Sequence, residues 1–416
     1  PAGLSAATEL AGSYTLLRAI AGPKGSVHIV GLASDATTHD DRAALEHAGM
    51  KTLDDSRVFA VQGWAPRDAV PRLEAFARRQ GLAVSFEDPG PGDNPPTLLS
   101  NPEPLAGGEA TVTFYMTPGY HTWDPSIVVY FSFALFFGMI FSDAGYGLLL
   151  GLILILTWRN LGKTRASRRF RNLVLMLVLA SLGYGMLVGS YFGVSPAKGT
   201  TLDSLKILDP SNRGQMMLLS ITIGAFHLML ANLVTAWRYR ESPRFLAPVG
   251  WAAMILGGLL AGVYRMGEEA AGPPLAIDYV LLIGGALAVL FFSSERPLPI
   301  KGIGDLAWRL LDGLQGLTNI SKAFGDVLSY LRLFALGLAS TQLAVTFNEI
   351  AAPMFQSRGI SLLAAIVVLI VGHGLNFVLA VVGGVVHGLR LNCIEFFNWS
   401  LPEEGYRFQE FCRKAN

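Results

Sequence analysis

Long apolar stretches separated by short polar ones fill the chain from about residue 125 onward. A helix rises roughly 1.5 Å per residue, so about 20 apolar residues cross the hydrocarbon core of a membrane. The pattern predicts seven apolar blocks: Ile127–Trp158, Asn172–Val194, Gln215–Trp237, Leu246–Met266, Ala276–Ser293, Ile320–Ala351 and Ile360–Ser400. We therefore expect an α-helical polytopic membrane protein.

The first apolar block is expected to be a hairpin. It is followed by the strongly basic loop Arg159–Arg171, and such loops are typically cytoplasmic. If the polar N-terminal part is cytoplasmic as well, the block has to cross twice. Two legs of roughly 16 residues, slightly short for a span, would turn near Asp143–Gly145. The result is about eight transmembrane helices with both termini inside.

The remaining charges agree with this topology. The segments expected inside hold basic clusters, at Arg238–Arg244, Arg296–Arg309 and Arg407–Lys414, and the outside loop after Met266 is acidic, with Glu268 and Glu269. The last two blocks are longer than a span requires, which predicts two long, tilted helices.

The first part of the chain predicts a small α+β lobe. Strand-like alternation occurs at Ser26–Ala33 and Arg57–Gly63, and amphipathic helices are expected at Asp41–Gly49 and Pro66–Gln80. A linker rich in proline and glycine follows, at Asp88–Gly108. The expected organisation is a cytoplasmic lobe and linker over 1–108, a connector over 109–126, a transmembrane domain over 127–400 and a cytoplasmic tail over 401–416. The chain starts at Pro1, which suggests that the N-terminal domain is incomplete.

Composition supports the membrane class. Of 416 residues, 51% are hydrophobic and only 15% charged, and 46 are glycine. A formal net charge of +1 gives no reason to expect nucleic acid as a partner. The two cysteines, Cys393 and Cys412, support neither a disulfide scaffold nor a zinc site. No cofactor or metal is expected.

A few polar residues fall at apparent membrane depth. Arg332 lies in the apolar stretch Phe324–Leu343, and a permanently charged guanidinium is costly there unless water or a counter-charge meets it. On a helix, five residues of the last block form one polar stripe: His373, Asn376, Gly383, His387 and Arg390. The candidate functional residues are Asp143, His227, Asp326, Ser329, Arg332, His387, Arg390 and Glu395. Carboxylates and imidazoles at this depth can pass protons, whereas an arginine acts as a fixed positive charge that favours the ionised form of a nearby carboxylate.

Each candidate has a structural alternative. For Ser329, we favour a hydrogen bond between helices over a role in transport. For His227 and His373, a role in packing and a role in a water path are equally expected. Asp143 either caps a helix or faces water, and we favour the second. Asp326 points roughly 120° away from Arg332 on the helix and is not its partner. The carboxylate that meets Arg332 need not lie in this chain.

Several stretches resemble one known family. They are GWAPRDAVPRL (63–73), PPTLLSNP (95–102), YMTPGYHTWDP (115–125), FFGMIFSDAGYG (136–147), SITIGAFHLMLAN (220–232), SYLRLFALGLAS (329–340) and HGLRLNCIEFF (387–397). The chain is similar in these stretches to the membrane stator subunit of rotary V-type and A-type ATPases, called subunit a in eukaryotes and subunit I in prokaryotes. The short outer loops resemble the prokaryotic type, so the resemblance implies a prokaryotic cell (inner) membrane.

The resemblance implies a mechanism. Two tilted helices would face a rotating ring of small proteolipid subunits, each with an intramembrane Glu or Asp, between two offset half-channels. Arg332 and Arg390 match the essential arginines, His387 and Glu395 the polar and acidic positions around the second arginine, and Asp143 an aspartate near a half-channel. Tyr146 stands where many relatives carry histidine. Thr318 and Asn319 occupy the region in which relatives often carry a glutamate of a half-channel. Asp326 is the candidate to take the place of that glutamate.

The implied function is a non-catalytic, proton-translocating stator subunit. Its implied partners are the ring, peripheral-stalk subunits, central-stalk and ring-associated subunits and membrane lipid. The family normally has a longer cytoplasmic arm than this chain shows. One alternative is a sodium-translocating version. Another is a secondary transporter or channel with Arg332 as an anion site, which predicts internal inverted repeats and broken helices, neither of which the sequence clearly shows. A purely structural anchor leaves both arginines unexplained.

Overall fold

The computed structural model describes residues 14–21, 53–54, 59–90, 92–266, 276–296, 302–356 and 360–409. The predicted strand at 26–33, the predicted helix at 41–49, the acidic pair Glu268 and Glu269, Cys412 and Lys414 lie outside these residues. The chain forms two compact units. The first comprises residues 1–100, 113–124 and 403–416, and the second comprises residues 101–112 and 125–402.

The first unit contains an antiparallel sheet in the order β2-β3-β1-β4. Its strands are β1 (Tyr14–Ala21), β2 (Leu53–Asp54), β3 (Phe59–Pro66) and β4 (Ala83–Glu87). In the central pair, Tyr14 lies opposite Pro66 and Ala21 opposite Phe59. β3 confirms the strand predicted at Arg57–Gly63, shifted by a few residues. A two-stranded ladder also pairs β5 (Thr117–Pro118) with β6 (Glu404–Gly405).

One helix accompanies this sheet. The 3₁₀ turn η2 (Arg67–Ala69) leads into α4 (Val70–Gln80), which packs against β4. Pro71 lies in the first turn, where its missing N–H removes no helical hydrogen bond. The helix ends at Gly81, whose φ of 68° is left-handed and costs glycine little. The described residues of this part of the chain thus contain both strands and a helix, and the extent of the predicted α+β lobe stays a prediction.

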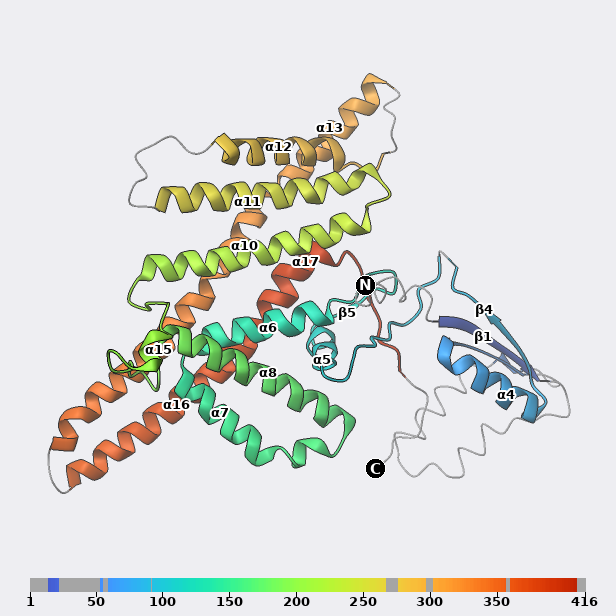
Figure 1. Cartoon of the computed structure of the whole chain (residues 1–416). Helices are drawn as coiled ribbons and strands as arrows, with labels where there is room; N and C mark the ends of the chain where they lie inside the picture. The colour runs from blue at the N-terminus through green and yellow to red at the C-terminus, as the bar shows by residue number, and fades with distance from the viewer. Residues whose placement is uncertain are drawn as a thin grey trace. The chain divides into compact units, whose positions relative to one another are not determined.

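The second unit is almost entirely helical over its described residues. Its elements are α5 (Gly107–Thr113), α6 (Ser126–Phe141), α7 (Ala144–Thr157), η3 (Asn160–Gly162), α8 (Arg165–Val188), α9 (Thr201–Ser204), α10 (Arg213–Arg238), η4 (Pro243–Phe245), α11 (Leu246–Met266), α12 (Ala276–Phe292), α13 (Ile303–Leu317), α14 (Ile320–Ser329), α15 (Leu331–Gln356), α16 (Ile360–Arg390), the π-helix η5 (Leu391–Phe396) and α17 (Phe397–Ser400). Figure 1 shows α10, α11 and α12 side by side.

Five helical segments of the described part are long and apolar enough to cross a membrane: 165–188, 213–238, 243–265, 303–355 and 360–400. Three shorter apolar helices, α6, α7 and α12, have 16, 14 and 17 residues. The polytopic helical class is therefore supported, whereas a total of eight transmembrane helices stays a prediction.

The turn predicted inside the first apolar block is present. Ser142 ends α6 with a left-handed φ of 49°, and Asp143 begins α7 as its N-cap. Both α6 and α7 pack on α8, which Figure 1 shows in green beside them. The block is thus split into two legs at the expected place, and whether each leg crosses the membrane remains a prediction.

The segment after α12 differs from the expectation of a basic loop. The helix α13 begins at Ile303, and Arg309 is 3% exposed. Its Nη2 donates to the Arg296 carbonyl at 2.7 Å. Gly313 permits close packing, since a Cβ there would lie 1.8 Å from the Leu290 carbonyl oxygen. Arg309 therefore fixes the joint between α12 and α13, because it satisfies a backbone carbonyl.

The block expected at Ile320–Ala351 is interrupted at Tyr330. α14 ends at Ser329 and α15 begins at Leu331. The Tyr330 ring is fully buried against α10, where a Cβ on Gly224 would lie 2.4 Å from the ring. Glycine at position 224 therefore makes room for the aromatic ring at the break, and Arg332 follows directly after it.

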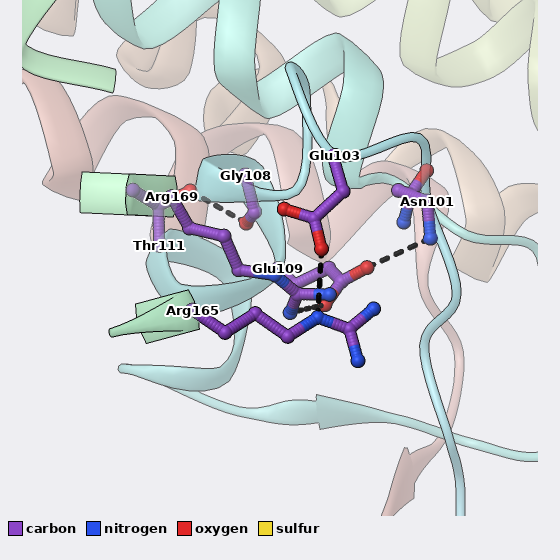
Figure 2. A network of polar contacts seen from close by, with 7 residues as sticks. All are labelled: Asn101, Glu103, Gly108, Glu109, Thr111, Arg165 and Arg169. Carbon is purple, nitrogen blue, oxygen red and sulfur yellow. Dashed lines mark hydrogen bonds and ion pairs between the residues drawn. The ribbon is translucent and has the colours of Figure 1, made fainter. Parts of the chain in front are cut away.

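The connector before α6 is held to the start of α8 by the charged side chains in Figure 2. Arg169 Nη1 lies 2.6 Å from Glu109 Oε2, and Arg165 Nε lies 2.7 Å from Glu103 Oε1. The second carboxylate oxygen of Glu109 accepts from the Asn101 backbone N–H at 2.8 Å. The first of these ion pairs is largely buried and the second is exposed.

Candidate functional site

The candidate site lies where the long helices α15 and α16 meet at one end. The two helices pack on each other and are joined by the short segment 357–359, so they run antiparallel. Arg332 is near the start of α15 and Arg390 is the last residue of α16, which brings both guanidiniums to the same end of the pair. Figure 1 shows the pair in orange and red.

An acidic residue of the same chain joins these arginines. Arg332 Nη1 lies 3.9 Å from Glu395 Oε1, and the two side chains are 24% and 3% exposed. The charge of Arg390 acts on both of these groups, and His387 lies within electrostatic reach of both arginines. The structure therefore brings together four candidates from the sequence: Arg332, His387, Arg390 and Glu395.

The π-helix η5 explains how Glu395 comes to lie beside Arg390. Five residues separate the two, which on an α-helix places them about 140° apart. A π-helix closes its turn between residues i and i+5, so residues five apart lie nearly above one another. The segment Leu391–Phe396 is π-helical. This local change of pitch aligns the carboxylate with the polar stripe of α16.

The cluster has an excess of positive charge. Two guanidiniums face one carboxylate, and Arg390 is exposed and has no ion pair among the described residues. Unit charges 4 Å apart interact by about 4 kcal/mol at an effective dielectric of 20. One cation therefore stays without a neutralising partner, on a segment apolar enough to lie in a membrane.

An exposed apolar stripe of α16 leads to this cation. We call it the α16 stripe, and it consists of Val371, Leu375, Val378, Val382 and Val386, each more than 50% exposed. The spacing of three or four residues keeps these side chains on one face, and Arg390 continues the series one turn after Val386. The arginine thus ends a long apolar face that no described residue covers.

Asp326 and Ser329 lie on the neighbouring helix α14. Asp326 Oδ2 accepts from Trp399 Nε1 at 2.7 Å, and among the described contacts it does not pair with Arg332, in agreement with its predicted direction. Ser329 donates to the Gly325 carbonyl of its own helix at 3.0 Å, and its hydroxyl also lies within hydrogen-bonding reach of Glu395, so the expected contact between helices is present as well.

His227 has the surroundings of a packing histidine. Its ring stacks on Phe396 with centroids 4.4 Å apart, meets Phe136 edge to face, and is 7% exposed. Nδ1 is 2.7 Å from Tyr330 Oη, whereas Nε2 has no hydrogen-bond partner in the described part of the chain. Of the two alternatives for this residue, packing fits its neighbours better.

Asp143 faces neither water nor the arginine cluster. Its side chain is 1% exposed and accepts four hydrogen bonds. The donors are the backbone N–H groups of Tyr146 (3.1 Å), Phe192 (2.9 Å) and Gly193 (2.9 Å) and the Ser190 hydroxyl (2.6 Å). The water-facing interpretation favoured from the sequence is wrong for this structure. Asp143 caps α7 because it accepts from the Tyr146 N–H, and its other three bonds hold the loop that follows α8.

A second polar group was only partly visible in the sequence. His373 and Asn376 belong to the expected stripe of α16, but their partner Tyr146 was noted only as a departure from histidine. The Tyr146 hydroxyl lies 2.7 Å from His373 Nδ1 and accepts from Asn376 Nδ2 at 3.0 Å. A buried tyrosine in an apolar helix was the available signal, since its hydroxyl requires a partner.

Comparison with known proteins identifies the family. Over 373 residues the chain is 32% identical to "V-type ATP synthase subunit I 1" of Treponema pallidum, which covers 85% of this chain. It is 29% identical over 426 residues to "V-type ATP synthase subunit I" of Chlamydia pneumoniae, and 26% identical over 397 residues to "A-type ATP synthase subunit I" of Methanocaldococcus jannaschii. The chain is a member of the V-type and A-type ATP synthase subunit I family. No family model matches it.

The match to the subunit I family covers most of this chain but only part of its relatives. The alignments cover 85%, 85% and 86% of the chain and 60%, 58% and 55% of the Chlamydia, Treponema and Methanocaldococcus proteins. The chain therefore spans little more than half the length of these subunit I proteins. Membership of the family agrees with the membrane-protein character of the helices.

Proposed function

We propose that this chain is the non-catalytic, ion-translocating membrane subunit of a rotary ATPase, in which Arg332 and Arg390 promote loss of a proton from a carboxylate on a partner ring. The observation that carries the proposal is the excess positive charge of the arginine cluster at the end of the exposed α16 stripe. The names of the relatives, ATP synthase subunit I, support the assembly into which it fits.

The α16 stripe is the proposed contact with the ring. Small membrane subunits present apolar side chains with an occasional carboxylate, and an exposed apolar face ending in a cation matches that surface. When such a carboxylate passes Arg390, the guanidinium stabilises its ionised form. The negative charge of Glu395 reduces the electrostatic repulsion between Arg332 and Arg390. The ring carboxylate then binds a proton again after it leaves the cation.

The proposed path for protons on one side runs along α14. Lys322 is exposed, Asp326 is half-buried on the same face, and Ser329 lies beside Glu395. Lys322, Asp326 and Ser329 follow at intervals of four and three, so they share one face of α14, which ends at Ser329. We assign Asp326 as the titratable group of this half-channel and His387 as the polar group next to the arginines.

The same arrangement suits a sodium-coupled subunit, since a positive charge also releases Na⁺ from a ring carboxylate. We favour protons because the polar groups near the arginines include an imidazole and carboxylates, which accept and donate protons. A purely structural anchor gives no reason for an exposed arginine at the end of an apolar stripe.

The test is ATP-driven acidification of membrane vesicles that contain the complete complex. Arg332→Ala should abolish acidification at matched assembly, and Arg159→Ala, which removes an exposed arginine of the basic loop, should leave it unchanged. A parallel assay of ATP-driven Na⁺ uptake with a protonophore present separates the two ions. Undiminished pumping by the Arg332→Ala complex would overturn the proposal.

A further inference from the structure

A second hydrogen-bonded chain lies far from the arginines, among α7, α15 and α16. His373 Nδ1 is 2.7 Å from Tyr146 Oη, and His373 Nε2 is 3.0 Å from Asn348 Oδ1. Tyr146 Oη accepts from Asn376 Nδ2 at 3.0 Å. At roughly 1.5 Å per residue, His373 lies about 25 Å from Arg390 along α16, toward the end of the helix that begins at Ile360.

The hydrogen-bond partners of His373 determine which of its ring nitrogens carries a hydrogen. Asn348 Nδ2 donates to the Phe192 carbonyl at 2.8 Å, so its Oδ1 faces His373 and can only accept. His373 Nε2 therefore carries a hydrogen. Since Tyr146 Oη already accepts from Asn376, its own hydrogen points to His373 Nδ1. The neutral imidazole, protonated on Nε2, satisfies every one of these groups.

This row of hydrogen-bonded side chains leads from the edge of the helix bundle into its interior. His373 and Asn348 are partly exposed, whereas Tyr146 and Asn376 are 0% and 1% exposed. Asn376 continues inward to Ser340, whose hydroxyl donates to Asn376 Oδ1 at 3.3 Å. A row of polar groups with one partly exposed end is the arrangement that intramembrane proton paths require.

The tyrosine allows both protonation states of the histidine. If His373 gains a proton on Nδ1, the new N–H can donate to Tyr146 Oη, because a hydroxyl oxygen has two lone pairs. The hydroxyl hydrogen then turns away from the ring. Asp143 is the charged group of α7 that acts on His373, and α15 presents the uncharged Asn348 to it. A packing histidine does not need a partner that can reverse its hydrogen bond.

We propose that His373 is a proton-carrying residue of a half-channel on the side of α16 that begins at Ile360, with the Tyr146 hydroxyl as its switching partner. This inference rests on the proposed function and adds the second of the two paths. In the step itself, a proton from water at the partly exposed edge binds to Nδ1. It leaves again, to water or to the next polar group, as the Tyr146 O–H resumes donation to Nδ1. The imidazole alternates between neutral and singly charged forms.

The experiment measures ATP-driven acidification by vesicles that contain the complete complex, with the amount of assembled complex determined in each preparation. His373→Gln keeps a polar side chain that can reach both neighbours but cannot titrate. We expect it to lower the acidification rate about tenfold or more at matched assembly. Tyr130→Phe is the matched control. It removes a tyrosine hydroxyl that donates to the Asn172 carbonyl and takes no part in the hydrogen-bonded row around His373.

A rescue distinguishes proton carrying from packing. The double variant Tyr146→His, His373→Tyr keeps one imidazole and one phenol in contact but exchanges their helices. Proton carrying predicts that it recovers most of the pumping lost in His373→Gln. It also predicts that the pH dependence of pumping between about pH 5 and 8 is altered by His373→Gln and restored in the double variant.

Three outcomes are informative. If His373→Gln pumps at the wild-type rate with an unchanged pH profile, the inference is wrong. If it lowers only the amount of assembled complex, His373 has a structural role and the inference is also wrong. Arg332→Ala, measured in the same series, keeps the two proposals apart. Loss of pumping in Arg332→Ala alone would leave the proposed function standing without this path.

Discussion

Arg332 and Glu395 come from different helices, and their charged atoms lie 3.9 Å apart. Glu395 reaches this position because the π-helix η5 brings it onto the side of Arg390. The pair leaves the positive charge of Arg390 exposed, so the carboxylate sets how much cationic character the cluster presents.

Glu395→Gln should leave Arg332 without its charge partner inside the chain. We expect the two guanidiniums to bind a passing carboxylate too tightly and to repel one another, so that ATP-driven pumping falls about tenfold or more. The measurement is vesicle acidification at matched assembly. Glu349→Gln, which changes an exposed carboxylate on α15, should pump normally. Normal pumping by Glu395→Gln would show that the ion pair has no part in transport.

Asp143→Ala should destabilise the membrane domain. It removes the acceptor of three buried backbone N–H groups and one hydroxyl, which is expected to cost about 2 to 4 kcal/mol of unfolding free energy. Thermal unfolding of the purified complex in detergent measures the effect. Asp203→Ala, in an exposed turn that holds the Gly199 N–H, should cost less than about 1 kcal/mol. An unchanged Tm with abolished pumping would instead favour a direct role in transport.

Arg169→Ala and Arg165→Ala should differ, although both remove an arginine bonded to a carboxylate (Figure 2). Loss of Arg169 deprives the largely buried Glu109 of its charge partner and should cost about 3 kcal/mol. Loss of the exposed Arg165 should cost about 0 to 1 kcal/mol. Limited proteolysis of the connector 101–112 measures the difference. Equal sensitivity of the two variants would contradict the assigned burial.

Gly313→Ala should disturb the joint between α12 and α13, because its Cβ would lie 1.8 Å from the Leu290 carbonyl oxygen. We expect a loss of about 1 to 3 kcal/mol as the helices separate. Gly304→Ala, in the same helix with open space around the site, should be neutral or slightly stabilising. The unfolding temperatures of the two variants provide the measurement. A stable Gly313→Ala protein would argue against this close approach.

The helical class and the split of the first apolar block were predictable from the sequence because both depend on local composition. The turn at Ser142 and Asp143 follows from a short polar interruption in an apolar run. The break at Tyr330 was not predictable, because it depends on Gly224, a residue of another helix that receives the ring. α13 was missed because Arg296 and Arg309 resemble the charges of a cytoplasmic loop, whereas Arg309 is buried in a joint.

The sequence predicted which residues belong to the site better than it predicted which of them contact one another. Costly charges at membrane depth selected Arg332 and Arg390 without any structure. The partner of Arg332 was not predictable, since α-helical spacing places Glu395 on another side of the helix than Arg390 and only the π-helix changes that. Asp143 was misread because three of its four donors are backbone and hydroxyl groups of a distant loop that carries no charge pattern.

The most direct test of the account is a disulfide cross-link between the α16 stripe and the ring. Val386→Cys lies one turn before Arg390, and Ile283→Cys, on the exposed face of α12, is the control. Each is combined with a cysteine next to the membrane carboxylate of the small ring subunit in the complete complex. We predict a rapid cross-link from position 386 that stops ATP-driven pumping, and none from position 283. No cross-link from position 386 in the assembled complex would contradict it.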